Sequence, residues 1–191
     1  MKNAQTHLKN TPPAPKSSTI SAKKAAMLGC ITAVALLAFM VENLFPPLIP
    51  AVPYIRIGLS NYFVLLTMAL YGKKEGFLVL TAKLFLGALI AGRTASLLVG
   101  IAGAYSSYLV MALLCREKTP FSLFGVGASG AVIGNLLRTA TAAVLLGSPQ
   151  LFSFAVYGIV IGLCSGGLIG IAVQLTFYAL PQKFLLSMQN L

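Results

Sequence analysis

Aspartate and tryptophan are absent from this sequence, and acidic residues of any kind number three. Without aspartate, no aspartate-rich magnesium site can form. The single histidine, His7, lies in a polar N-terminal segment, and no glycine-lysine phosphate loop occurs. No nucleophilic side chain has a plausible base close to it in the sequence. We therefore predict a protein that is not an enzyme and that uses no metal ion or cofactor.

Charge is also scarce, because charged residues make up 9% of the chain and hydrophobic residues 58%. Soluble globular domains carry roughly 25% charged residues. The apolar runs are continuous over ~17–25 residues and do not alternate as barrel strands do. These features predict an all-α integral membrane protein. The three cysteines, Cys30, Cys115 and Cys164, are too far apart for a disulfide framework or a metal site.

Turns rich in glycine, proline or charge divide the apolar sequence into six segments. They predict a six-helix transmembrane bundle with helices at Ser21–Leu44, Ile57–Tyr71, Gly76–Ala91, Ser96–Cys115, Phe121–Leu146 and Leu151–Leu180. Residues 1–20 are polar and proline-containing, so we expect a flexible cytoplasmic arm there. The transmembrane domain is then 21–183, and 184–191 form a C-terminal tail.

The formal net charge of +11 comes from basic residues that cluster on one side of the predicted bundle. Ten of them lie on the side of the two termini, against Arg56 and Arg93 on the opposite side. Cytoplasmic segments carry such an excess, so both termini are expected in the cytoplasm. This distribution explains the charge without nucleic acid as a partner.

The segment Val41–Asn61 contains four prolines, which exclude a continuous helix, yet it is rich in apolar side chains. Irregular backbone near lipid is tolerated where protein or a water-filled cavity satisfies its polar groups. The segment is therefore either a lid over a cavity on the outer face or a rigid hairpin lying in the membrane interface.

Two cations, Lys83 and Arg138, fall inside predicted spans, ~12–14 Å below their outer ends at 1.5 Å per residue. A cation in the middle of a span costs about 2.5–3.5 kcal/mol on insertion scales. The outer half of the predicted bundle contains four cations, these two residues with Arg56 and Arg93, and one acidic residue, Glu42. We infer that an anionic ligand, with a carboxylate, phosphate or diphosphate, completes the charge balance.

Asn135, three residues from Arg138, and Asn61, at the end of the proline-rich segment, are further candidates for ligand contact. The alternative is that Lys83 extends toward a lipid headgroup and Arg138 bonds backbone carbonyls. The sequence leaves both interpretations open.

Small residues recur every four positions in two spans. One stripe is Gly158, Gly162, Gly166 and Gly170, and the other is Ala25, Gly29 and Ala33. Such stripes let helix backbones approach closely. Either stripe can serve packing within the chain or docking of another membrane subunit, and the first helix is the candidate for docking.

The segments VENLFPPLIP, IRIGLSN, GKKEG, LVMALL and GASGAVIGN resemble the Gx transporter family, also labelled heptaprenyl diphosphate synthase component I. That family is grouped with the S components of energy-coupling-factor importers. The resemblance implies a lid at Pro46–Asn61 and docking of a transmembrane coupling subunit at Ala25, Gly29 and Ala33. It further implies cytoplasmic ATPases as partners and a bacterial cytoplasmic membrane as the location.

Three functions follow as hypotheses. The first is the substrate-binding subunit of an importer for an anionic or vitamin-like small molecule. The second is a non-catalytic membrane component of polyprenyl diphosphate synthesis, and the third is a structural assembly factor. A polar outer cavity favours the first, a lateral lipid-facing groove the second, and a solid bundle the third.

Overall fold

The computed structural model describes residues 22–44, 57–91, 94–115 and 122–180. Within these ranges the chain forms six α-helices and one 3₁₀ helix: α2 (Ala22–Leu44), α3 (Leu59–Tyr71), α4 (Lys73–Ala91), α5 (Thr94–Leu114), α6 (Leu123–Leu146), η1 (Pro149–Phe154) and α7 (Ala155–Ala179). The prediction of six helices is confirmed. The N-terminal arm, most of the proline-rich segment and the C-terminal tail lie outside the described residues.

Two predicted helix starts are wrong by several residues. Helix α4 begins at Lys73 and not at Gly76, because Gly72 alone makes the turn after α3, with φ 113°. The acidic residue Glu75 lies in the first turn of α4, where it interacts favourably with the helix dipole. Helix α7 begins at Ala155 and not at Leu151, because Pro149 opens a 3₁₀ helix that fills the interval.

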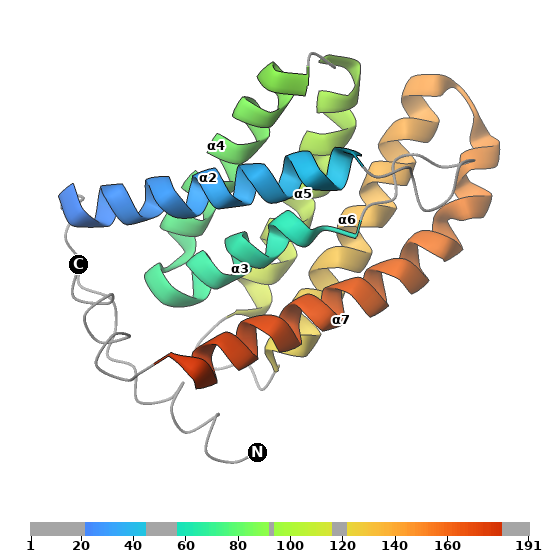
Figure 1. Ribbon diagram of the computed structural model, residues 1–191. Helices are drawn as coiled ribbons and strands as arrows, with labels where there is room; N and C mark the ends of the chain where they lie inside the picture. The colour runs from blue at the N-terminus through green and yellow to red at the C-terminus, as the bar shows by residue number, and fades with distance from the viewer. Residues whose placement is uncertain (1–21, 45–56, 92–93, 116–121, 181–191) are drawn as a thin grey trace.

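The six α-helices form two layers of three. Helices α2, α3 and α7 cross in front of α4, α5 and α6 in the view of Figure 1. The most extensive packing joins α6 to α7 and α5 to α6, whereas α2 packs on α3 and α4. Helix α3 also contacts α7, and α4 contacts α5, so the two halves of the chain meet through these pairs.

Helix α3 is the shortest of the six and lies near the centre of the bundle. Its buried residues include Val64, Leu65 and Met68, which join the main apolar core with residues of all five other helices. The phenolic group of Tyr62 shares a hydrogen bond of 2.6 Å with the hydroxyl of Thr176 and so ties α3 to α7. The position of α3 is thus set by packing on several sides.

The outer surface of the bundle is apolar. Large hydrophobic side chains are exposed on every helix, including Leu37, Leu89, Val144 and Leu168. Soluble monomers rarely expose such extensive apolar surface. Four helical segments among the described residues are long and apolar enough to cross a membrane: Ala22–Leu44, Leu97–Leu114, Leu123–Leu146 and Pro149–Ala179. These observations support a membrane protein; that all six helices cross the membrane stays a prediction.

Candidate functional site

Among the residues that the structure describes, two cations are buried inside this apolar bundle. The side chain of Lys83 on α4 is 1% exposed, and that of Arg138 on α6 is 9% exposed. Both point inward, so Lys83 does not extend toward a headgroup at the surface. Buried charged groups need polar partners, because the interior solvates them poorly. The neighbours of these two residues therefore define the candidate site.

The ammonium group of Lys83 is held by the beginning of α3. It donates hydrogen bonds of 3.0 Å to Oγ of Ser60 and of 3.0 Å to Oδ1 of Asn61. Both acceptors are neutral oxygens, so they stabilise the ammonium without cancelling its charge. This arrangement brings two predicted site residues, Lys83 and Asn61, into direct contact.

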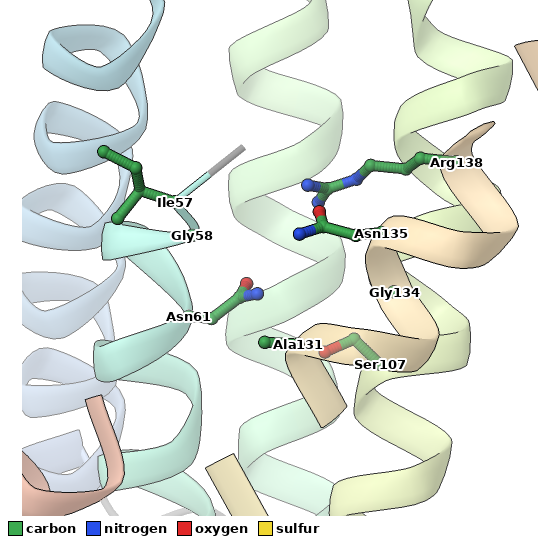
Figure 2. Close-up of a pocket in the computed structure, with 8 residues that line it drawn as sticks. All are labelled: Ile57, Gly58, Asn61, Ser107, Ala131, Gly134, Asn135 and Arg138. Carbon is green, nitrogen blue, oxygen red and sulfur yellow. The ribbon is translucent and has the colours of Figure 1, made fainter. Parts of the chain in front are cut away.

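The side chain of Arg138 reaches the interior by crossing α5 at a glycine. A Cβ added at Gly103 would lie 2.1 Å from Cγ and 2.5 Å from Nε of Arg138, so the arginine occupies the space of the missing side chain. Asn135, one turn earlier on α6, donates from Nδ2 to the carbonyl of Gly158 at 3.3 Å. Its amide oxygen faces the guanidinium group in Figure 2.

A small polar cavity lies between α3, α5 and α6, with a volume of about 10 Å³. It is lined by Ile57, Gly58, Asn61, Ser107, Ala131, Gly134, Asn135 and Arg138. Figure 2 shows the Asn61 side chain pointing from α3 toward α6 across this space, with Arg138 above it. The volume suits about one water molecule, far below the roughly 300–1,000 Å³ of ligand pockets.

Ser107 on α5 contributes a neutral hydroxyl group to the cavity wall. The residue is 1% exposed, and its hydroxyl oxygen has no hydrogen-bond partner among the described residues. Leaving a buried hydroxyl unbonded costs roughly 1–3 kcal/mol. A ligand atom that enters the cavity and hydrogen-bonds this hydroxyl would remove the cost.

Glu42, the predicted acidic member of the site, lies at the end of α2 and contacts the start of α3. Its carboxylate accepts a hydrogen bond of 2.5 Å from the backbone N–H of Gly58, which has a left-handed conformation with φ 81°. Glu42 thus joins the two described ends of the proline-rich segment. Arg56 and Arg93, the other predicted cations, lie outside the described residues.

The predicted docking stripe is on the outside of the bundle. Ala25, Gly29 and Ala33 are all exposed, and a Cβ added at Gly29 would meet nothing within 4 Å. They line an apolar groove of about 440 Å³ between α2 and α4, together with Leu28, Thr32, Leu36, Leu78, Ala82 and Leu86. The groove is far larger than the polar cavity and separate from it.

Three residues of the site were missed from the sequence: Ser60, Gly103 and Ser107. A partial signal exists for two of them, because Gly103 and Ser107 are four residues apart and so share one face of α5. The same spacing, Gly134 to Arg138, occurs on the facing surface of α6. Ser60 is adjacent to Asn61, which the sequence analysis did select.

The fold and the site together define a helical protein with an apolar exterior and a basic polar core. A family model described as heptaprenyl diphosphate synthase component I matches residues 31–176. This match covers well over half of the chain, which therefore belongs to that family, as the motifs predicted. No curated protein and no solved structure matches the chain.

Proposed function

We propose that this chain is the membrane-embedded ligand-binding subunit of a small-molecule importer, similar to an S component, and that its ligand carries an anionic group. The observation that carries the proposal is the burial of Lys83 and Arg138 around one small polar region, with Asn61 touching Lys83 and lining the same cavity as Arg138. The ligand enters from the outer face, at the end of the bundle where α3 begins.

Charge balance supports an anion as the ligand. Among the described residues of this region, Lys83 and Arg138 carry two positive charges and Glu42, which accepts a hydrogen bond from Gly58 at the cavity wall, carries one negative charge. Glu75, the other glutamate that the structure describes, is paired with Lys24 at 2.8 Å on another part of the bundle. A carboxylate or phosphate group would balance the excess and bind the guanidinium with charge-assisted hydrogen bonds.

The cavity has to enlarge to bind a metabolite under this proposal, because its volume of about 10 Å³ is far below that of ligand pockets. Ligand entry requires the wall formed by Ile57, Gly58 and Asn61 to move away from α6. Gly58 is suited to such a movement, since glycine adopts positive and negative φ values with similar ease. The lid predicted at Pro46–Asn61 would move with this wall.

The partners in the proposal are a transmembrane coupling subunit and cytoplasmic ATPases. The exposed stripe of Ala25, Gly29 and Ala33 supports a docking role, because its small side chains permit close approach of another helix. We place the protein in a bacterial cytoplasmic membrane with both termini in the cytoplasm. The excess of basic residues on the terminal side supports this orientation.

The proposal is tested by mass spectrometry of small molecules that co-purify with the protein in detergent. We expect a discrete anionic metabolite with the parent protein, and loss of most of it in Lys83→Ala and Arg138→Ala. Lys74→Ala, which removes an exposed lysine at the start of α4, is the matched control and should retain the ligand. If folded Lys83→Ala and Arg138→Ala both retain the ligand as the parent does, the anion-binding site is wrong.

A second candidate function is a non-catalytic role in heptaprenyl diphosphate synthesis. The apolar groove between α2 and α4 favours it, because a polyprenyl chain could lie along its leucine and alanine side chains. The description of the family points in the same direction. Recovery of a polyprenyl diphosphate in place of a small metabolite, and its loss in Gly29→Leu, would favour this function.

A further inference from the structure

The cavity wall contains an amide whose orientation is fixed by a neighbouring charge. An ammonium group donates hydrogen bonds and accepts none. Because Lys83 bonds the side chain of Asn61 at 3.0 Å, the oxygen of that amide must face Lys83. The NH₂ group of Asn61 is then directed away from Lys83. Asn61 lines the cavity, whereas Lys83 is not among the residues that line it.

The other polar groups at the cavity are also donors. The guanidinium of Arg138 has five N–H donors and no acceptor, and the hydroxyl of Ser107 is buried without a described partner. Asn135 does not counter this pattern, because its NH₂ group bonds the Gly158 carbonyl and its oxygen faces Arg138. The cavity therefore presents three donor groups on three different helices, α3, α5 and α6.

We propose that this cavity binds an oxyanion of the ligand, a carboxylate or a phosphate, through Asn61, Ser107 and Arg138, and that Lys83 is a positioning residue that orients Asn61. This inference rests on the proposed function and deepens it. It changes the role of Lys83, which the sequence analysis treated as a ligand contact. The ammonium acts through the amide and not by touching the anion.

The two roles of Lys83 predict opposite results for one variant. In Asn61→Ala, Lys83 keeps its charge, but its ammonium group loses the amide oxygen that accepts one of its hydrogen bonds. If Lys83 bound the anion directly, binding would be retained or would improve. If Lys83 acts through Asn61, removal of Asn61 removes a donor, and binding weakens by about tenfold.

The experiment is a double-mutant cycle on Asn61→Ala, Lys83→Met and the combined variant, with inorganic phosphate and acetate as probes. Binding is followed by the shift of the Asn135 side-chain NH₂ signal, which every variant retains, in protein labelled with ¹⁵N-asparagine, at constant ionic strength set with chloride. The Asn61 signal is followed as well wherever Asn61 is present. Each single variant should bind about tenfold more weakly, and the double variant little more weakly than either, because the two residues act as one unit. Lys74→Met is the control and should bind like the parent.

The experiment distinguishes failure of this inference from failure of the proposed function. If the parent binds a probe but Asn61→Ala binds it equally well, or if the two losses simply add, Lys83 does not act through Asn61, and the ligand-binding function stands. If neither probe shifts any asparagine signal of the parent, the oxyanion site is wrong, and the proposed function loses its anionic ligand with it. A shift of the Asn61 NH₂ signal in the parent and non-additive losses support the inference.

Discussion

The bundle contains two stripes of small residues with the same four-residue spacing and opposite environments. On α7, a Cβ added at Gly166 would lie 2.4 Å from the backbone oxygen of Gly127 on α6, and one at Gly170 would lie 2.3 Å from that of Leu123. On α2, a Cβ added at Gly29 would meet no atom within 4 Å. The same sequence pattern thus accompanies the most extensive helix packing among the described residues and an open groove.

This difference shows what a small-residue stripe can and cannot indicate. The pattern indicates that a helix backbone is accessible to another helix. It does not indicate whether that helix belongs to the same chain. On α7 the partner is α6 of the same chain, whereas on α2 the stripe faces the groove that we propose as a docking site for another subunit.

The largest effect is expected from filling the α6–α7 contact. Gly166→Ala should destabilise the fold by about 1–3 kcal/mol, because the new methyl group meets the backbone of α6, which cannot move aside cheaply. Gly166→Leu should abolish the folded, monodisperse protein. Size-exclusion chromatography and thermal unfolding in detergent measure both effects. Normal unfolding of Gly166→Leu would show that α6 and α7 are not in close contact.

An intermediate effect is expected at Gly103, where α5 contacts a side chain and not a backbone. Gly103→Ala places a methyl group in the space of Arg138, which must leave its position across α5. We expect a loss of about 1 kcal/mol in stability, at the low end of the range for overpacking because a flexible side chain can move aside, and a loss of nearly all ligand binding.

The matched control for Gly103→Ala is Gly100→Ala on the same helix, where a Cβ would meet nothing within 4 Å. Gly100→Ala should leave both the stability of the fold and ligand binding unchanged. Equal ligand binding in the two variants would contradict the role of Gly103 in placing Arg138.

Most of the fold could be predicted from the sequence, because long apolar runs interrupted by glycine, proline and charge determine helix number directly. The starts of α4 and α7 could not be predicted. Gly72, with a positive φ of 113°, shortens one turn to a single residue, and Pro149 opens a 3₁₀ helix through Phe154 where the start of the sixth helix was expected. Both outcomes depend on local backbone conformation, which hydropathy does not report.

Three members of the candidate site were selected from the sequence. Lys83 and Arg138 were selected because charged side chains are costly in apolar helices, and this physical reason applies whatever the packing; Asn61 was selected for its place at the end of the proline-rich segment. The roles of Ser107 and Gly103 depend on which helices are neighbours, and the register between α5 and α6 is a tertiary property. The direction of the Lys83 side chain, toward Ser60 and Asn61, likewise required the structure.

The smallest effect on stability is expected at Gly29, and this variant sharpens the comparison of the two stripes. Gly29→Leu should change the free energy of unfolding of the isolated chain by no more than about 0.5 kcal/mol, because the new side chain enters the open groove. The same leucine would keep a second helix away from α2. Co-purification with the proposed coupling subunit should therefore fail, while ligand retention by the isolated chain remains at the level of the parent. If Gly29→Leu unfolds the chain as Gly166→Leu does, the groove is closed by residues of this chain, and the two stripes serve the same purpose.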